Sequence, residues 1–412
     1  MKVQQSPFNF EQCMKCTICT SYCPMLAVNP SYPGPKQAGP DGMRFRIKDA
    51  KAYDEALKYC LNCKRCEVNC PSNVKVGDII QAAKLKYNTV SPKLRDRMLA
   101  NTDFVGTMAS PFAPIVNGVL GLKPVAGVLD GVFGIDHRRR FPKYSGEKFV
   151  TWFKKNAKAS QASYKEQVSY FHGCYVNYNF PQQGKDFVKV LNALGVGVNM
   201  LDGEKCCGVA LISNGFKGQA TSHAKANVAA IRKSHGAGLK TITTSTTCAL
   251  TMRDEYPELL GVPNADIRED ILTSTRYIYE LIESGKAKVV FKDDYKAKIA
   301  YHTPCHLEKL GWGIYTSLLL KMIPGVEFIQ LDQNCCGISG TFGFKKENYE
   351  YSQAIGKKLF DSIEAAAPDF VACDCETCKW QIEMSTPYKV QHPISILAEA
   401  IDLEKTAALN SK

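Results

Sequence analysis

The spacing of apolar residues changes along the chain. It predicts helices in the N-terminal part and alternating strands and helices in the C-terminal part. Apolar positions recur three and four residues apart in 53–60 (Tyr53, Ala56, Leu57, Cys60) and in 76–87 (Val76, Ile79, Ile80, Ala83, Tyr87), as on one face of a helix. From about residue 166, short β-rich runs alternate with helical stretches such as 187–194, which ends before Gly195.

Two of these β-rich runs open two copies of one unit. "VSYFHGC" (168–174) lines up with "IAYHTPC" (299–305), and each run is followed by "CCG", at 206–208 and at 335–337. "TITTSTTC" then reaches Cys248, and "FVACDCETC" reaches Cys373, Cys375 and Cys378. Strands alternating with helices in both copies predict two α/β halves related by pseudo-symmetry.

The middle of the chain is apolar and then basic. Residues 104–135 are largely apolar but contain Pro111, Pro114 and Pro124, which are expected to break a spanning helix three times. "HRRR" (137–140) follows, and 138–165 hold nine Lys and Arg residues against one acid, Glu147, with aromatic residues at 149, 152 and 153. This pattern predicts a segment that lies in the membrane interface and is attracted by anionic lipid. An apolar hairpin packed on the core is the alternative. Nucleic acid is not an expected partner, because no nucleic-acid module accompanies the charge.

Composition limits the chemistry. The chain has 412 residues, 45% of them apolar, a formal charge of +12 and eighteen cysteines. Its N-terminus lacks the apolar core of a secretion signal, and no run of about 18 apolar residues predicts a membrane span. Many cysteines without export indicate reduced thiols, which bind metal more often than they form disulfides.

The N-terminal cysteines follow C-x2-C-x2-C-x3-C-P twice, the pattern of two-cluster bacterial ferredoxins, in which the fourth cysteine of each run ligates the other cluster. Two [4Fe-4S] clusters are therefore predicted. The first is bound by Cys13, Cys16, Cys19 and Cys70, and the second by Cys60, Cys63, Cys66 and Cys23. Zinc is the alternative, but it usually takes pairs of two-cysteine knuckles.

Adjacent cysteines strain an ordinary zinc site and are better suited to neighbouring metals in a cluster. The pattern C…CCG…CxxC resembles the cysteine-rich CCG domain of the heterodisulfide reductase family, whose five cysteines hold a non-cubane [4Fe-4S] cluster. The resemblance implies such a cluster in the second copy, with Cys373 as an extra thiol. The complete set is Cys305, Cys335, Cys336, Cys375 and Cys378. In the first copy Thr251 is expected at the fifth position, which leaves Cys174, Cys206, Cys207 and Cys248 for a cluster, zinc or structural thiols.

The flanks of the two cysteine-rich regions carry further candidates. His302 and His306 lie beside Cys305 and are candidate donors near a cluster or a quinone, although isolated histidines are also often structural. No strand is followed by G-x-G-x-x-G, so no FAD or NAD site is predicted. The chain is therefore expected to relay electrons rather than to dehydrogenate a substrate.

The resemblance extends along nearly the whole chain, through "NPSYPGPKQAGPDG", "SPFAPIVN", "DHRRRFPKYS" and "YHTPCHLEKLGW". These stretches are similar to the iron-sulfur subunit family of anaerobic glycerol-3-phosphate dehydrogenases. The resemblance implies flavoprotein partners, subunits A and B, menaquinone as acceptor, and a peripheral position on the cytoplasmic side of the inner membrane. Related families leave two alternatives: an iron-sulfur subunit of a glycolate or lactate oxidase, or a catalytic heterodisulfide reductase-like subunit.

The expected fold class is α+β and multidomain, with an all-α helical ferredoxin domain followed by two pseudo-symmetric α/β CCG domains. The expected boundaries are 1–92 for the ferredoxin domain and 93–165 for the apolar and basic connector. The first CCG domain is expected over 166–290 and the second over 291–412.

Overall fold

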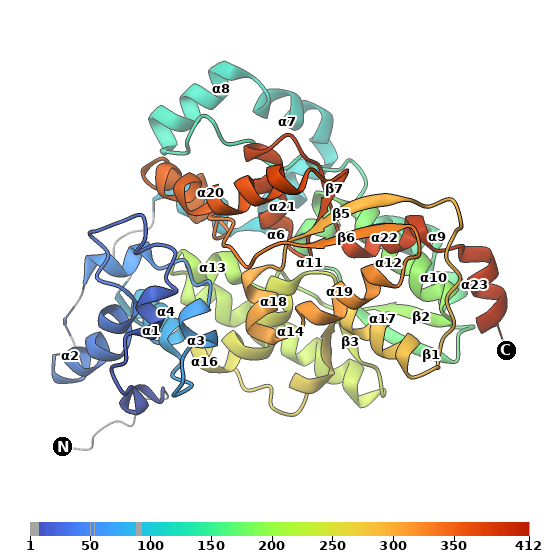
Figure 1. Ribbon diagram of the computed structural model, residues 1–412, viewed down its shortest axis with the longest axis horizontal. Coiled ribbons are helices and arrows are strands. Elements are labelled where there is room, and N and C mark those ends of the chain that lie inside the picture. Colours follow the sequence, from blue (N-terminus) through green and yellow to red (C-terminus); the bar gives the residue numbers. More distant parts are fainter. Residues whose placement is uncertain (1–7, 50, 53, 88–92, 412) are drawn as a thin grey trace.

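The computed structural model describes residues 8–49, 51–52, 54–87 and 93–411. These residues form a small helical module, a helical connector and two parallel sheets covered by helices (Figure 1). This confirms the predicted fold class, while the exact domain boundaries stay predictions.

The N-terminal module consists of short helices, because its cysteine loops interrupt the chain every few residues. Its elements are η1 (Phe10–Gln12), α1 (Ile18–Ser21), the π-helix η2 (Gln37–Asp41), α2 (Gly42–Lys48), η3 (Glu55–Tyr59), α3 (Arg65–Val68) and α4 (Val76–Tyr87). The helix predicted from Tyr53 is a short 3-10 helix, η3, and Tyr53 itself lies outside the described residues. The second predicted helix is confirmed as α4, which buries Val76, Ile79 and Ile80.

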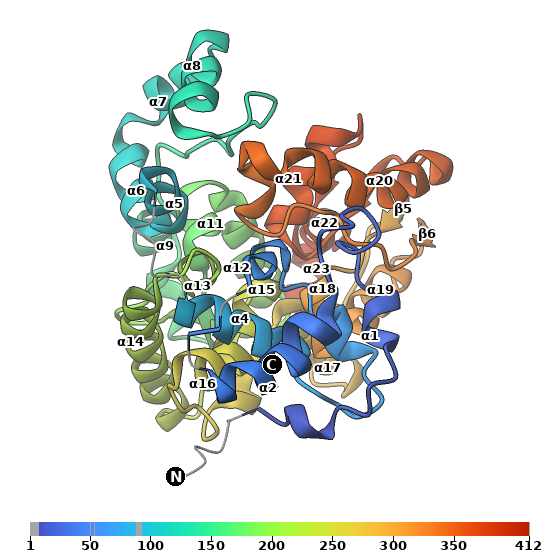
Figure 2. The same cartoon turned by 90° about the vertical axis from the view of Figure 1, so that its left-hand side faces the viewer.

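The connector is helical and partly leaves the body of the protein. Its elements are α5 (Leu94–Ala100), α6 (Thr102–Ala109), η4 (Ser110–Phe112), α7 (Ala113–Leu120), α8 (Lys123–Val128), the π-helix η5 (Leu129–Phe133), α9 (Phe149–Asn156) and α10 (Lys158–Gln161). Both views show α7 and α8 projecting from the rest of the chain (Figures 1 and 2). We call residues 102–133 the arm.

Of the three breaks expected at prolines, the one at Pro124 is present, because Pro124 lies in the first turn of α8 directly after a sharp bend, whereas Pro111 and Pro114 cause no such bend. Pro111 and Pro114 fall in the first turns of η4 and α7, where a missing N–H group costs no helical hydrogen bond. The direction changes sharply after Leu120, where Thr102–Leu120 and Lys123–Phe133 meet at 87°. No single helix of the described residues has the length and apolarity for a membrane span, although this bent pair meets both criteria when its two parts are taken together.

Two of the aromatic residues after the arm are buried rather than on the predicted membrane face, whereas Arg140, Lys154 and Lys155 remain exposed. Phe149 and Phe153 of α9 are buried in the core, where Phe149 packs edge-to-face against Tyr170. Arg139 is also buried, and its guanidinium donates to the Gly343 carbonyl at 2.7 Å. Arg138 is paired with Asp136. These side chains hold the connector on the body, so they are not free to bind lipid.

The first half contains a four-stranded parallel sheet in the order β2-β1-β3-β4. Its strands are β1 (Glu166–Phe171), β2 (Val196–Met200), β3 (Thr241–Thr243) and β4 (Ile271–Thr273). Its helical elements are α11 (Gly173–Tyr178), α12 (Pro181–Ala193), α13 (Val209–Ser213), α14 (Lys217–Gly236), α15 (Thr246–Leu250), the π-helix η6 (Thr251–Glu255), α16 (Tyr256–Leu260), η7 (Arg268–Asp270) and α17 (Ser274–Glu283).

The second half repeats this topology in the order β6-β5-β7-β8, again all parallel. Its strands are β5 (Ala297–Tyr301), β6 (Val326–Gln330), β7 (Phe370–Ala372) and β8 (Val390–Gln391). Its helical elements are α18 (Cys305–Leu310), α19 (Gly313–Lys321), η8 (Phe342–Phe344), η9 (Lys346–Asn348), α20 (Tyr349–Ala366), α21 (Glu376–Ser385), α22 (Pro393–Ala400) and α23 (Leu403–Asn410).

The two halves share one hydrophobic core. Tyr170 and Phe187 of the first half belong to the same buried cluster as Ile299, Tyr301 and Ile394 of the second. Helix α12 packs against α22 and α23 from the other half. Because this core is continuous, the cysteine loops at the ends of both sheets are held in fixed relation to each other.

Candidate metal centres

All eighteen cysteines are free thiols, and all but Cys373 fall into four groups. The outer N-terminal centre is the group Cys13, Cys16, Cys19 and Cys70, and the inner N-terminal centre is Cys23, Cys60, Cys63 and Cys66. The first-repeat centre is Cys174, Cys206, Cys207 and Cys248, and the second-repeat centre is Cys305, Cys335, Cys336, Cys375 and Cys378.

In the N-terminal module, a cysteine of the second run lies close to the cysteines of the first run. Burial raises the pKa of Cys19, and the neighbouring thiols of Cys13, Cys70 and Cys16 raise it further. Cys70 therefore lies with the first run although it belongs to the second. The ligand assignment itself stays a prediction.

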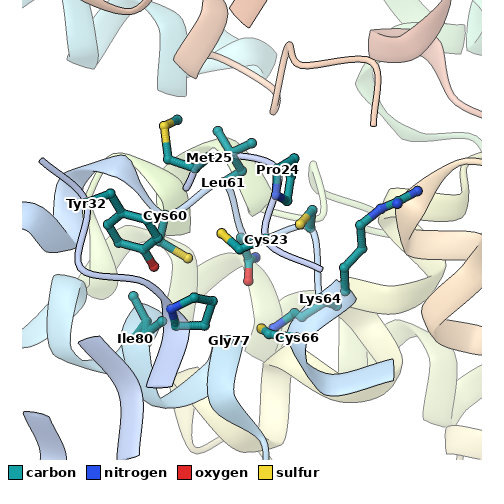
Figure 3. Close-up of a pocket in the computed structure, with 14 residues that line it drawn as sticks. Cys23, Pro24, Met25, Tyr32, Cys60, Leu61, Lys64, Cys66, Gly77 and Ile80 are labelled. Atoms are coloured by element: carbon teal, nitrogen blue, oxygen red, sulfur yellow. The ribbon is translucent and has the colours of Figure 1, made fainter. Parts of the chain in front are cut away.

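The inner N-terminal centre surrounds a cavity. Cys23, Cys60, Cys63 and Cys66 all line it, and Figure 3 shows three of these side chains around the same space, with Tyr32 and Ile80 beside them. Burial raises the pKa of Cys66 well above its usual value, and Glu67, Cys63, Cys60 and Cys23 add to this effect. A metal would offset this cost, because coordinated thiols are deprotonated by the cation's charge.

The backbone around both middle cysteines has the same unusual shape. Lys15 and Thr17 flank Cys16 with φ of 59° and 64°, and Asn62 and Lys64 flank Cys63 with φ of 56° and 61°. Left-handed conformations are costly for residues other than glycine, so the fold must impose them here. Alternation of left- and right-handed residues creates a concavity of backbone N–H groups, which suits anionic iron-sulfur clusters.

A buried charge network fixes the inner N-terminal centre to the first half. Lys64 is fully buried, and its ammonium contacts Asp78 and lies 3.5 Å from Glu255 of η6. Although burial opposes the charged form, Asp78, Glu67 and Glu255 hold the pKa of Lys64 well above its usual value. Lys309 of α18 pairs with Glu67 at 2.9 Å and extends the network to the second half.

The second-repeat centre lies where β5 and β7 end. Cys305 begins α18, and the sulfurs of Cys336 and Cys378 lie 3.3 Å apart. Contacts from Cys335 and Cys378 lower the pKa of Cys336 to about 6, and contact from Cys378 lowers the pKa of Cys375 to about 5. The pKa values of Cys305, Cys335 and Cys378 are instead raised, so all five thiols of this buried group would ionise only with a cation that offsets their charge.

The first-repeat centre is more closely associated with the arm. The sulfurs of Cys206 and Cys174 are 3.7 Å apart, and Thr102 of α6 donates to Cys206 Sγ at 3.2 Å. Asp103 accepts from the Cys206 backbone N–H at 2.7 Å. The base of the arm thus covers this group of thiols.

The expectation that Thr251 replaces the fifth cysteine of the first repeat is wrong. Tyr170 and Tyr301 occupy the same position in the two repeats. Tyr170 pairs with Ile242 on the neighbouring strand, and Tyr301 pairs with Ala372, so Ile242 corresponds to Ala372. Counting on from these residues, Ser245 corresponds to Cys375 and Cys248 to Cys378.

Two further features support this register. Ser245 and Cys375 are the N-cap residues of α15 and α21, and Thr251 is buried beyond the centre, where it donates to Glu255. Comparison of the two sequences from the strands onward shows the same correspondence, so the first repeat reads S-x-x-C where the second reads C-x-x-C.

The two candidate histidines have different surroundings. His306 bridges three parts of the protein: its Nδ1 is 3.1 Å from Thr247 Oγ1 of α15, and its Nε2 is 3.1 Å from the Asn62 carbonyl. His302 is fully buried, and burial lowers its pKa to about 3, so its imidazole is neutral. Neither site gives direct support for a bound quinone.

The inner N-terminal and second-repeat centres adjoin each other. Arg65, which lies two residues after Cys63, is 3.4 Å from Glu308 of α18. Although burial opposes the charged form, Cys305, Cys335, Glu308 and Cys63 together hold the pKa of this guanidinium above its usual range. No sequence pattern indicated this junction, because its two sides are more than two hundred positions apart.

Comparison with known proteins agrees with this organisation. The family model of the 4Fe-4S dicluster domain matches residues 9–74, and that of the cysteine-rich domain matches 168–253 and 299–383. The chain is 56% identical to the C subunit of anaerobic glycerol-3-phosphate dehydrogenase of Escherichia coli (strain K12) over 394 residues, which cover 95% of this chain and 99% of that protein. It is 22% identical to the glycolate oxidase iron-sulfur subunit of the same strain over 409 residues, covering 95% and 94% of the two chains. A subunit of fumarate reductase (CoM/CoB) of Methanothermobacter marburgensis is 26% identical over 90% of this chain and 67% of its own length.

Proposed function

We propose that this chain, which belongs to the family of the C subunits of anaerobic glycerol-3-phosphate dehydrogenase, carries electrons from flavoprotein subunits A and B to menaquinone and holds the complex on the cytoplasmic side of the inner membrane. The observation that carries the proposal is that the second-repeat centre adjoins two others: Arg65 lies between it and the inner N-terminal centre, and Thr247 of the first repeat lies 3.9 Å from Cys375 Sγ. Iron-sulfur clusters bound there would each accept and release one electron.

The donor end is the outer N-terminal centre. Cys16 is exposed, and the neighbouring side chains of Met14, Ile18 and Tyr22 are 66%, 38% and 51% exposed. A group of apolar side chains around an exposed centre suits a protein partner, because burial of these side chains favours association. We assign this face to the flavoprotein subunits.

The relay continues inward from this face. Pro24, Tyr32 and Ile80 give the cavity of the inner N-terminal centre a largely apolar lining. Arg65 lies between this centre and Cys305, and its positive charge favours additional negative charge on either side. His306, through its contacts with Thr247 and Asn62, holds the two repeats and the N-terminal module in register.

The acceptor end is the side of the arm. Phe104, Met108, Phe112, Ile115 and Val119 are spaced four, four, three and four residues apart, and all are exposed. They form one apolar stripe along Thr102–Leu120, which favours contact with lipid over the alternative of core packing. Because the base of the arm covers Cys206, electrons reaching the first-repeat centre would arrive next to the membrane surface.

A substitution at the inner N-terminal centre tests the relay. In the complex with its flavoprotein partners, Cys63→Ser is expected to abolish glycerol 3-phosphate-dependent reduction of a menaquinone analogue. Reduction of a soluble dye by the flavoprotein subunits is expected to continue. The control is Ser213→Ala, which removes a hydroxyl that donates to the Ala210 carbonyl of its own helix at 3.1 Å. Equal loss of both activities in Cys63→Ser would contradict the proposed relay.

A further inference from the structure

The imidazole of His302 has no hydrogen-bond partner among the described residues. The side chain is fully buried, and neither Nδ1 nor Nε2 finds a donor or acceptor in that part of the chain. An unsatisfied buried polar group is costly, so natural proteins seldom retain one without a compensating interaction. A bound group is therefore the natural partner for this ring.

Two thiols lie beside this ring. A ring nitrogen of His302 and the sulfurs of Cys373 and Cys378 all lie within 4.8 Å of one another. Metal–sulfur bonds of about 2.3 Å and metal–nitrogen bonds of about 2.0 Å place tetrahedral ligands roughly 3.5–3.8 Å apart. The three atoms therefore need only a small adjustment to bind one metal.

The sheet brings these residues together. The last residues of β5 and β7, Tyr301 and Ala372, pair in register, and His302 and Cys373 follow them directly. The His302 backbone N–H donates to the Ala372 carbonyl at 3.0 Å and continues the ladder. Both side chains are thus fixed by the strands at the carboxyl edge of the sheet.

The first repeat provides an internal comparison. In the same register, Phe171 takes the place of His302, and Thr243 takes the place of Cys373. Both candidate ligands are therefore replaced together by residues that do not bind iron. His172, which follows Phe171, has partners of its own, with Nδ1 2.8 Å from the Gly173 carbonyl.

We propose that His302 and Cys373 are additional metal ligands of the second-repeat centre, so that one iron of its cluster is bound by an imidazole nitrogen. Cys378 links this iron to the five-cysteine set. The imidazole adds a neutral ligand and Cys373 adds an anionic one, so the reduction potential of the centre depends on both side chains. This inference rests on the proposal that the second repeat holds an iron-sulfur cluster.

The test uses the full chain, purified anaerobically and poised oxidised or reduced. Pulsed electron paramagnetic resonance is expected to show a strongly coupled nitrogen, and growth with 15N-histidine is expected to change its spectrum without any substitution. The N-terminal centres offer only cysteine ligands, so they do not contribute this coupling. The same coupling should persist in the control His235→Gln, which changes a half-exposed histidine of α14 that pairs with Asp270.

The test variant takes its residues from the first repeat, where Phe171 and Thr243 occupy the positions equivalent to His302 and Cys373. His302→Phe together with Cys373→Thr is expected to remove the nitrogen coupling and to change the reduction potential or lower the iron content of the second-repeat centre. The inference would be overturned if this variant kept the potential and iron content of the parent, or if the iron-loaded parent showed no coupled histidine nitrogen. Either result would leave the proposed relay standing. A nitrogen-coupled centre that glycerol 3-phosphate never reduces would instead contradict the relay and leave the ligand assignment standing.

Discussion

Removal of the apolar stripe should release the protein from membranes. Phe104, Phe112 and Ile115 are 69%, 59% and 67% exposed, so their replacement by glutamine removes few contacts within the fold. Full burial of such a side chain is worth about 1.5–3 kcal/mol, and about two thirds of each remains available to lipid. The three together contribute about 3–6 kcal/mol, so the variant should bind vesicles at least about 100-fold more weakly.

The assay is co-sedimentation of the purified chain with vesicles that contain anionic lipid. The matched control carries Phe45→Gln, Ile314→Gln and Leu409→Gln, three side chains outside the arm that are 66%, 57% and 49% exposed. We expect the control to bind as the parent does. Equal loss in both variants, or full binding by the arm variant, would refute the assignment of the arm to the membrane.

Three further predictions concern stability and cluster binding. Gly337 has φ of 86°, and a Cβ atom there would lie 2.0 Å from the Ser352 carbonyl oxygen, whereas at Gly208 the nearest atom would be 3.7 Å away. Gly337→Ala should therefore lower the iron content of its centre far more than Gly208→Ala does. Lys64→Met leaves Asp78 and Glu255 buried without their cation and should destabilise the protein by about 3–5 kcal/mol, seen as a lower Tm, while Lys58→Met, an exposed change nearby, should have almost no effect. Burial raises the pKa of Asp186, so the folded protein loses stability as the pH rises through that pKa and the buried carboxyl becomes charged. Asp186→Asn should therefore raise Tm relative to the parent more at pH 8 than at pH 4, and a larger increase at pH 4 would contradict this reasoning.

The cysteine spacing indicated which thiols lie near one another, but it did not indicate what surrounds them. Spacing alone indicated that Cys70 joins Cys13, Cys16 and Cys19, because the ferredoxin pattern requires this exchange. The alignment of the two repeats was less evident from sequence, because the threonines and serines of "TITTSTTC" can be matched to the second repeat in several ways. The strand pairing of the two sheets shows that Ser245 is equivalent to Cys375. Strand pairing therefore corrected the position of the missing ligand.

Charge and aromatic content were poor guides to the surface. Within the run at 137–140, which suggested a lipid-binding patch, Arg139 is buried and Arg138 is paired with Asp136, while Arg140 is exposed. Phe149 and Phe153 look like interface anchors in sequence, but they pack in the core. The exposed stripe of the arm depends on which helix faces find a partner, and this is decided by tertiary packing rather than by periodicity.

The central claim is that electrons from glycerol 3-phosphate pass through this chain to quinone. The most direct test is anaerobic electron paramagnetic resonance of the chain in complex with its flavoprotein partners, recorded after glycerol 3-phosphate and again after a menaquinone analogue. We predict cluster signals that appear with glycerol 3-phosphate and disappear with the quinone. Clusters that respond to a chemical reductant but not to glycerol 3-phosphate would contradict the claim.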